Sequence, residues 1–245
     1  MPTPAPILVF DVNETLLDLE SLAPLFERLF GDRSALRAWF NALILNTQTL
    51  TLAGHYRPFN EIAATTLRMQ GELCQQRVTD SDLAALAAAV SSMPVADDVR
   101  EALERLQSVG FRLVTLTNSP PPPSPTPLER AGLADCFEHH FSVHAVRRFK
   151  PHPACYRQVA ETLSVEPGDL CLIACHAWDT LGARAVGCQS AWFNRPGNAT
   201  LALPGLPDAD FIAADLPSLV EELCAARSVS HTCRTADQSA NGCHF

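Results

Sequence analysis

The chain has 245 residues, of which 47% are apolar, and it carries a formal net charge of −9 at pH 7. This length fits one domain, or one domain that carries a smaller insert. The acidic balance argues against nonspecific binding to DNA or RNA, which requires a basic surface. No window reaches the ~18 uninterrupted apolar residues of a membrane-spanning helix. We therefore expect neither a nucleic-acid partner nor a membrane partner.

Nine cysteines are spread along the chain, and no two of them form a CxxC pair. A zinc site built from such pairs is therefore not expected. The first residues, MPTPAP, also lack the basic region and the apolar run of a secretory signal peptide. We interpret the cysteines as reduced, mostly buried thiols, and we expect a cytoplasmic protein.

Short apolar runs alternate with amphipathic helical patterns through most of the sequence. The expected strands lie at residues 7–11, 111–118, 140–144, 170–175, 190–194 and 210–214. The expected helices between them lie at residues 97–110, 127–133, 152–164 and 179–187. Buried strands that alternate with helices predict an α/β fold, with a doubly wound, Rossmann-like parallel sheet covered on both faces.

A long segment with no convincing strand follows the first expected strand. Its helical patterns lie at residues 21–30, 34–54, 59–73 and 81–93. A right-handed crossover between parallel strands needs only about a dozen residues. The surplus predicts a helical cap over residues 18–96, inserted into an α/β core made of residues 1–17 and 97–227. Such a cap would cover the site and exclude water; the alternative is a helical insertion far from the chemistry.

Two further segments have unusual compositions. Residues 119–127, SPPPPSPTP, contain six prolines in nine positions and cannot form the interior of a helix. This composition predicts an extended, polyproline-like loop beside a strand end. Residues 228–245 are polar and lack periodicity. We expect a disordered tail there, in which the histidines and cysteines form no convincing metal site.

Polar residues follow several expected strands at their carboxyl ends. Asp11 ends the first apolar run, Thr117 and Asn118 end the second, and a polar stretch follows Cys175. In doubly wound sheets, ligands bind beyond the carboxyl ends of the strands. We therefore expect the chemistry at this edge, with Asp11 at its centre.

Four motifs in order give the chain a resemblance to a known family. They are FDVNETLLD (10–18), LTNS (116–119), RRFKPHPACY (147–156) and ACHAWDTLGA (174–183). Over roughly residues 6–225 the sequence resembles the haloacid dehalogenase superfamily, and AWD followed by GA points to its type II 2-haloacid dehalogenases. The resemblance implies a haloacid dehalogenase type of core with an inserted cap, and a hydrolase that acts on carbon–halogen bonds. It also implies a homodimer, because members of this family are commonly dimers.

The resemblance implies catalytic roles for five residues, which are Asp11, Thr15, Lys150, His176 and Asp179. Asp11 would be the nucleophile that forms a covalent aspartyl ester, and Lys150 would keep it ionised. Thr15 could hold one oxygen of Asp11. Asp179, with help from His176, would orient or deprotonate the water that hydrolyses the ester. Three of these roles have a plain structural alternative: Thr15 or Asp179 could cap a helix, and Lys150 could be a surface lysine.

A second set of residues is expected to contact the substrate or the halide. Its members are Val12, Asn13, Phe40, Arg57, Thr117, Asn118, Tyr156 and Trp178. Well-studied family members carry an arginine just after a tryptophan at the start of the cap, where it helps to receive the halide. Here Phe40 follows Trp39. A cation could come instead from Arg57, or the halide could rest on Asn118 and aromatic edges.

Asn13 and Ala174 bear on the type of hydrolysis. The superfamily's phosphatases carry a second aspartate two residues after the nucleophile and an acid at the position of Ala174, which helps to bind Mg²⁺. An amide cannot serve as a general acid, and Asp11 with Asp179 is a poor set of oxygen ligands for Mg²⁺. A halide leaving group needs neither a proton nor a metal, so we predict no cofactor. The well-studied dehalogenases carry serine where Ala174 stands and asparagine where His176 stands.

The predicted function is hydrolytic dehalogenation of short 2-haloalkanoic acids to 2-hydroxy acids, with a small halogenated carboxylic acid as the partner. Two alternatives stay open. One is a Mg²⁺-dependent phosphatase that acts on a small metabolite, against which Asn13 and Ala174 count. The other is a non-catalytic binding member of the superfamily, which only Phe40 and the proline-rich loop support.

Overall fold

A six-stranded parallel sheet forms the centre of the protein in its computed structural model, which describes residues 5–121 and 125–240. The strands are β1 (Ile7–Phe10), β2 (Leu113–Thr117), β3 (His139–Ser142), β4 (Leu170–Ala174), β5 (Gln189–Phe193) and β6 (Phe211–Ala213). All neighbours pair in parallel, in the order β3-β2-β1-β4-β5-β6. The predicted α/β fold is confirmed. The strand order reverses at β1, so β1 ends at the switch point where such sheets bind ligands.

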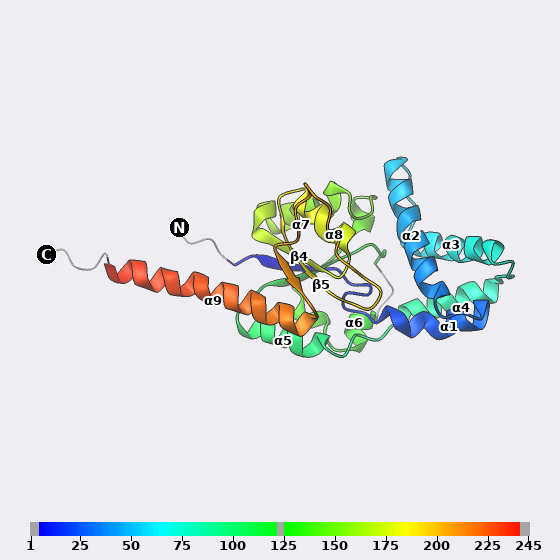
Figure 1. Ribbon diagram of the computed structural model, residues 1–245, viewed down its shortest axis with the longest axis horizontal. Coiled ribbons are helices and arrows are strands. Elements are labelled where there is room, and N and C mark those ends of the chain that lie inside the picture. Colours follow the sequence, from blue (N-terminus) through cyan, green and yellow to red (C-terminus); the bar gives the residue numbers. More distant parts are fainter. Residues whose placement is uncertain (1–4, 122–124, 241–245) are drawn as a thin grey trace.

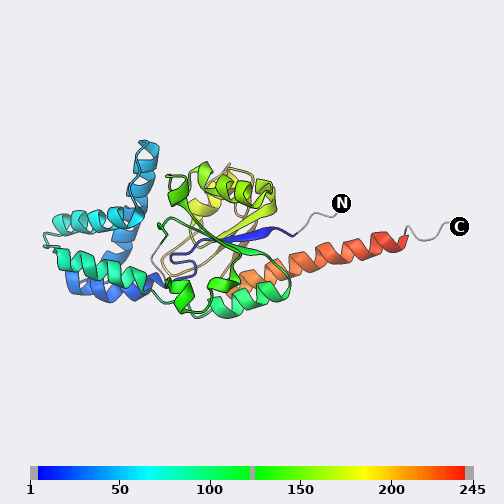
Figure 2. The same cartoon turned by 180° about the vertical axis from the view of Figure 1, so that it is seen from behind.

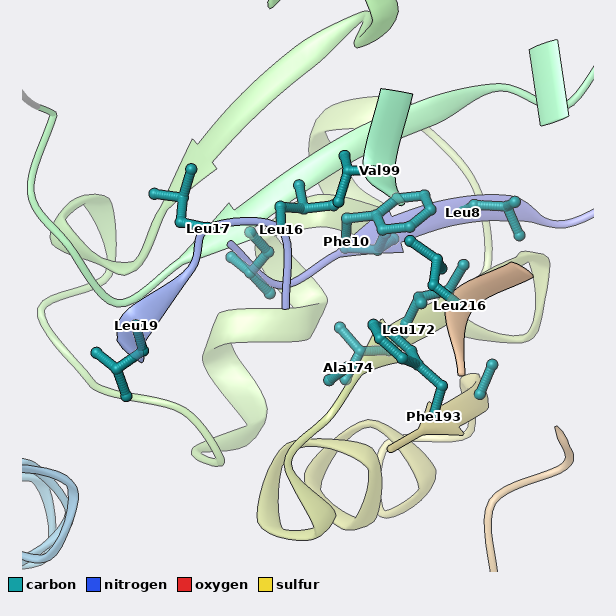
Figure 3. Packing of buried hydrophobic residues seen from close by; sticks show 14 of the residues in the cluster. Leu8, Phe10, Leu16, Leu17, Leu19, Val99, Leu172, Ala174, Phe193 and Leu216 are labelled. Carbon is teal, nitrogen blue, oxygen red and sulfur yellow. The ribbon is translucent and has the colours of Figure 1, made fainter. Parts of the chain in front are cut away.

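The two central strands, β1 and β4, are buried along their whole length. Their sequences, ILVF and LCLIA, are apolar throughout, as expected for parallel strands covered on both faces. Figure 3 shows Leu8 and Phe10 of β1 in the same buried cluster as Leu172 of β4 and Phe193 of β5. This core fixes the position at which β1 ends, and therefore the position of Asp11.

Helices cover both faces of the sheet. As Figure 1 shows, α7 (Pro153–Leu163) and α8 (Ala177–Arg184) lie on one face, and α5 (Val99–Ser108) and α9 (Leu216–Ala240) lie on the other. Four short 3₁₀ turns complete the chain, which are η1 (Leu19–Leu22), η2 (Ala134–Cys136), η3 (Val143–Ala145) and η4 (Pro167–Asp169). Among the described helices, none is both long enough and apolar enough to cross a membrane.

Residues 18–96 form the four predicted helices and add no strand to the sheet. These helices are α1 (Ala23–Phe30), α2 (Ala35–Leu52), α3 (Phe59–Leu73) and α4 (Asp80–Ser91). Figures 1 and 2 both show them as one group beyond the end of the sheet at which β1 stops. Trp39 holds the group together, because its indole N–H donates to the carbonyl of Ala63 at 3.1 Å and its ring lies 5.2 Å from that of Phe26. That these helices form a cap which covers the site and excludes water stays a prediction.

α9 runs from Leu216 to Ala240 and extends into the predicted tail, with no proline or glycine between residues 218 and 241 to break the helix. That residues 228–245 are a disordered tail stays a prediction. Residues 241–245 lie outside the described residues. The helix predicted over 127–133 is the single turn α6 (Pro127–Arg130), which ends before Gly132 in the left-handed conformation.

The proline-rich segment 119–127 is described only in part, because residues 122–124 lie outside the described residues. From Ser119 to Pro121 the chain is neither helix nor strand. Pro127 begins α6, and proline is accepted there because the first helical residue needs no N–H donor. The predicted polyproline-like conformation of the central prolines therefore stays a prediction.

Candidate active site

Asp11 follows β1 directly and is 4% exposed. The hydroxyl of Thr15 donates to its Oδ2 at 2.7 Å, and the ammonium of Lys150 donates to its Oδ1 at 2.7 Å. The backbone N–H of Cys175 donates to the oxygen of Thr15 at 3.3 Å, which leaves the hydroxyl proton for Asp11. Thr15 therefore binds the carboxylate, and each oxygen of Asp11 has one close donor.

Lys150 is fully buried and makes three hydrogen bonds with its ammonium group. Besides Asp11, Nζ donates to Oδ2 of Asp179 at 2.5 Å and to the carbonyl of Leu116 at 3.0 Å. Burial alone would lower the pKa of Lys150, but the two carboxylates outweigh it and raise that pKa. Lys150 is therefore not a surface lysine. Burial would raise the pKa of Asp11, but the nearby Lys150 and His176 outweigh burial and lower this pKa.

Asp179 lies in the first turn of α8 and is fully buried. Its Oδ1 accepts a hydrogen bond from the hydroxyl of Tyr156 at 2.6 Å, while Oδ2 accepts from Lys150. Its carboxylate therefore faces the site, and His176 occupies the N-cap position of α8. Burial, followed by the nearby charge of Asp11, raises the pKa of Asp179 despite the opposing effect of Lys150. A raised pKa suits a carboxylate that takes up and returns a proton.

Gly182 lets α8 come close to Tyr156. A Cβ at position 182 would lie 2.5 Å from the hydroxyl of Tyr156 and 2.5 Å from Cβ of Pro151. A side chain there would displace Tyr156 from Asp179. The close approach explains why the fourth motif has a glycine at position 182.

The loops after β1 and β2 are tied to each other. Nδ2 of Asn13 donates to Oγ of Ser119 at 3.2 Å, and the N–H of Ser119 donates to the hydroxyl of Thr117 at 3.1 Å. Asn118 is 5% exposed, and its Oδ1 accepts from the backbone N–H of Lys150 at 3.1 Å. Asn118 thus positions Lys150 and keeps its amide nitrogen for another partner. Val12 is half-buried beside Asp11.

His176 lies between two carboxylates and two aromatic rings. Its Nε2 is 2.8 Å from Oε2 of Glu14, and its Nδ1 is 3.3 Å from Oδ2 of Asp11. Its ring is stacked on Trp178, with centroids 4.9 Å apart, and lies 5.7 Å from the ring of Phe40. Burial alone would lower the pKa of His176, but the acidic groups of Cys175, Asp11 and Glu14 raise it well above its ordinary value.

Glu14 and Arg37 belong to the site and were not predicted. Glu14 is 5% exposed, and its second oxygen binds the guanidinium of Arg37, from α2 in the cap, at 2.5 Å. Arg37 also donates to the carbonyl of Pro196 at 3.1 Å. An acid inside the first motif was the available signal for Glu14. For Arg37 the signal was its position three residues before Phe40, which places both on one face of a helix.

Arg57, which was considered as a substitute cation, is exposed on the loop between α2 and α3. Two aromatic residues near Arg57 in the chain, Tyr56 and Phe59, contact the α/β core instead. The ring of Tyr56 is stacked on that of Phe149 at 5.2 Å, and Phe59 lies 6.1 Å from the same ring. Phe149 immediately precedes Lys150, and its N–H donates to the hydroxyl of Thr51 at 3.0 Å. The cap thus contacts the segment that carries the buried lysine.

The six charged side chains of the site form an ion network. Its members are Asp11, Glu14, Asp179, Arg37, Lys150 and His176. The three acids and three bases balance when the imidazole is protonated. Buried charges are tolerated only when they are paired in this way.

The described residues offer one arrangement with metal-ligand spacing, in which Glu14, Cys175 and His176 bring ligand atoms within 4.8 Å of one another. Both carboxylate oxygens of Glu14 are already bound to His176 and Arg37. A thiol, an imidazole and a single carboxylate are also a poor set for Mg²⁺, which prefers oxygen ligands. The donor set therefore fits an ion network better than a magnesium site.

Comparison with known proteins places the chain in a family. The family model for haloacid dehalogenase-like hydrolases matches residues 6–187. The chain belongs to this family. Within it, the chain is similar to the haloacetate dehalogenase H-2 of Moraxella sp. (strain B), with 29% identity over 208 residues, 82% of this chain and 91% of the relative.

Two further relatives agree over most of their length. The (S)-2-haloacid dehalogenase 2 of Pseudomonas sp. (strain CBS-3) is 29% identical over 223 residues, which cover 90% of this chain and 97% of the relative. The crystal structure of an L-2-haloacid dehalogenase is similar with a TM-score of 0.83 and 29% identity, and covers 90% of this chain and 99% of that one. The resemblance to the 2-haloacid dehalogenases and the Rossmann-like fold are thus confirmed.

Proposed function

We propose that the protein hydrolyses short 2-haloalkanoic acids to 2-hydroxy acids through a covalent ester on Asp11. The observation that carries the proposal is the surroundings of this carboxylate. Lys150 and Thr15 hold its two oxygens, and the residue two positions later is an amide and not an acid. The similarity to curated 2-haloacid dehalogenases over most of the chain supports the same reaction.

The first step is displacement at carbon. One oxygen of Asp11 attacks C2 of the substrate in line with the carbon–halogen bond, the C–O bond forms, and the halide leaves with the bonding electron pair. C2 is inverted. Lys150 keeps Asp11 ionised among the other acids, and partial removal from water makes the carboxylate a better nucleophile. The halide needs no proton, so the amide of Asn13 is no obstacle.

The second step is hydrolysis of the ester at the carbonyl carbon of Asp11. Asp179, with help from His176, orients a water and takes its proton. The ester bond to the Asp11 carbonyl breaks, and the 2-hydroxy acid leaves with one of the original oxygens of Asp11. The new carboxylate keeps one oxygen from water, and a proton is released to solvent.

Substrate contacts are proposed for side chains around this centre. Asn118 and the adjacent backbone at residues 117–119 would donate hydrogen bonds to the substrate carboxylate or to the halide. Phe40 and Trp178, on either side of His176, would form apolar walls. The exposure of Arg57 makes it the weakest member of the proposed set.

We also propose that the protein acts as a homodimer in the cytoplasm. Four large apolar side chains of the cap, Leu45, Leu52, Met69 and Leu73, are exposed and could contribute to contact between subunits. The seven cysteines whose side chains the structure describes are free thiols, which suits a reducing compartment.

The function is tested by measuring free halide released from 2-chloropropionate and from monohaloacetates, beside a generic phosphatase assay with Mg²⁺. We expect halide release and no phosphate release. Phosphate release without halide release would contradict the proposal in favour of a phosphatase. The absence of both products would favour a binding protein.

A further inference from the structure

Glu14 combines an unusual backbone with a fully engaged side chain. Its φ is 68°, in the left-handed region that residues with a Cβ seldom adopt. Its side chain is buried, and its two oxygens bind Arg37 and His176. Such a conformation persists when its surroundings hold it in place, and it is often found at functional sites. The proposed mechanism assigns Glu14 no role.

The geometry around His176 requires donors on both sides of the ring. Nε2 faces Oε2 of Glu14 at 2.8 Å, and Nδ1 faces Oδ2 of Asp11 at 3.3 Å. A neutral imidazole carries only one N–H, so one of its lone pairs would point at a carboxylate. The doubly protonated ring places a proton on the nitrogen beside each carboxylate. Glu14 therefore supplies the charge that keeps His176 protonated after Asp11 is esterified.

Nδ1 of His176 has no hydrogen-bond partner of good geometry, although it is buried beside Oδ2 of Asp11. That oxygen already accepts a hydrogen bond from Thr15. When water adds to the ester on Asp11, negative charge develops on the oxygen that stays as the carbonyl. If the other oxygen, Oδ1, forms the ester, Thr15 and His176 stand on either side of this charge.

We infer that Glu14 is a positioning residue, which holds His176 with Nδ1 beside Oδ2 of Asp11, where its N–H can stabilise the negative charge formed during ester hydrolysis. The inference rests on the proposed function and deepens its second step. Water adds to the carbonyl carbon, the carbonyl electrons move to Oδ2, and they return when the bond to Oδ1 breaks. Donors already in place for such a charge commonly make a large contribution to catalysis.

Arg37 connects the contact between Glu14 and His176 to the cap. Its guanidinium is held between Glu14 and the carbonyl of Pro196, and a Cβ at position 197 would come within 2.9 Å of it. Glu20 lies on its outer side at 3.6 Å and is half-exposed. Docking of α2 thus fixes the carboxylate of Glu14, so the position of His176 depends on a docked cap.

The charged and titratable groups that face His176 are Glu14, Asp11 and Cys175; Arg37 and Lys150 lie beyond the two acids. Phe40 from α2 and Trp178 from α8 add no charge. Loss of the carboxylate of Glu14 should lower the pKa of His176. If hydrolysis needs protonated His176, activity falls as pH rises through the pKa of this residue. In a Glu14 variant this fall should therefore occur at lower pH than in the wild type.

The test compares Glu14→Gln with two other variants. Glutamine keeps the size of the side chain and an oxygen for Nε2, but removes the charge. Glu14→Gly removes the whole side chain and relieves the left-handed backbone, which offsets part of the cost of leaving Arg37 and His176 without their carboxylate. Glu20→Gln is the matched control, because it removes a carboxylate that faces Arg37 without contact to His176.

We expect both Glu14 variants to lower kcat by about 10²-fold, the order for loss of one donor to a developing charge. KM should fall with kcat, because slower hydrolysis lets the ester accumulate, so kcat/KM should change little. Halide release should show a burst equal to the enzyme concentration, and the ester on Asp11 should accumulate and be detectable by mass spectrometry. Glu20→Gln should behave as the wild type. The inference would be overturned if the Glu14 variants kept the kcat and the pH profile of the wild type and accumulated no ester. In that case, halide release by the wild type would still uphold the proposed function.

A measurement on the protein without substrate tests the inference about Glu14 separately from the proposed function. With ¹⁵N-labelled histidine, and His176→Gln to assign the signal, the wild type should show both nitrogens of His176 protonated at a pH where free histidine is neutral. Glu14→Gln should lose this pattern. A neutral His176 in the wild type would overturn the inference, whether or not the protein releases halide.

Discussion

The ammonium nitrogen of Lys150 lies 2.7 Å from Oδ1 of Asp11, and neither side chain is appreciably exposed. Lys150 is the only lysine in the chain, in which every other basic side chain except histidine is arginine. A compact ammonium can direct its three N–H groups at Asp11, Asp179 and the carbonyl of Leu116. A guanidinium is larger and keeps its N–H groups in one plane, so arginine is not equivalent to lysine at this position.

Removal of this ammonium should disable the site. Lys150→Ala leaves two buried carboxylates without their cation, so one of them should take up a proton. We expect activity to fall by at least ~10²-fold, as for loss of an electrostatic stabiliser, and the fold to be retained by circular dichroism. The matched control is Arg68→Ala, which removes an exposed cation of α3 and should not change halide release. An active Lys150→Ala variant would mean that the reaction does not need the charge of this lysine.

Because the chain has one lysine, its protonation can be followed directly. With ¹³C-labelled lysine, the side-chain signal of Lys150 should stay that of the charged form through the pH range in which ordinary lysines titrate, since Asp11 and Asp179 raise its pKa. A raised pKa in the folded state stabilises the fold below the unfolded pKa, and this stabilisation is lost as pH rises through the folded pKa. Asp11→Asn should bring the titration to lower pH. An ordinary titration in the wild type would mean that this ion pair does not form.

Metal removal should leave the activity unchanged. Asn13 donates to Ser119 and provides no carboxylate, and Ala174 ends β4 without a polar side chain, as Figure 3 shows. We expect the same halide release with EDTA as with added Mg²⁺. If turnover collapsed on chelation and returned with Mg²⁺, the dehalogenase interpretation of this site would be wrong.

Phe40 should influence the choice of leaving group. It lies on α2 against His176, and the guanidinium of Arg37 is 5.9 Å from its ring centroid. Phe40→Arg introduces the cation that family members use for the halide, so the relative rates for fluoride, chloride and bromide should change. Thr49→Arg, at an exposed position of the same helix, is the control and should not alter them. An unchanged halide profile for Phe40→Arg would mean that position 40 does not face the halide.

The sequence predicts the framework of the site well, for a physical reason. Parallel strands end at one edge, so Asp11 after β1, Asn118 after β2 and His176 after β4 had to lie near one another. Lys150 and Asp179 were placed by their motifs. Their burial, and the hydrogen bond between Tyr156 and Asp179, follow from how closely α8 packs, which Gly182 allows and no periodicity shows.

The missed part of the site is a contact between distant segments. Glu14 and Arg37 come from the core and the cap, and their pairing depends on how the two dock. Sequence alone reveals neither this pairing nor the left-handed backbone of Glu14. The extension of α9 to Ala240 was not predicted for a different reason: residues 228–240 lack a periodic pattern, but a chain without proline or glycine can continue a helix that has already begun.

The nucleophilic role of Asp11 is the central claim, and isotope exchange tests it most directly. The reaction is run in H₂¹⁸O with enzyme in excess over substrate, so that each active site turns over once. If Asp11 attacks carbon, water is added at its own carbonyl carbon, and the product carries away an oxygen that belonged to the protein. Asp11→Asn should abolish steady-state turnover, because an amide is a far weaker nucleophile.

We expect ¹⁸O in the peptide that contains Asp11 and almost none in the hydroxyl group of the 2-hydroxy acid. Water that attacked C2 directly, with Asp11 as a base, would place the label in the product and leave the peptide unlabelled. Label found only in the product would therefore contradict the covalent mechanism, even if halide were released.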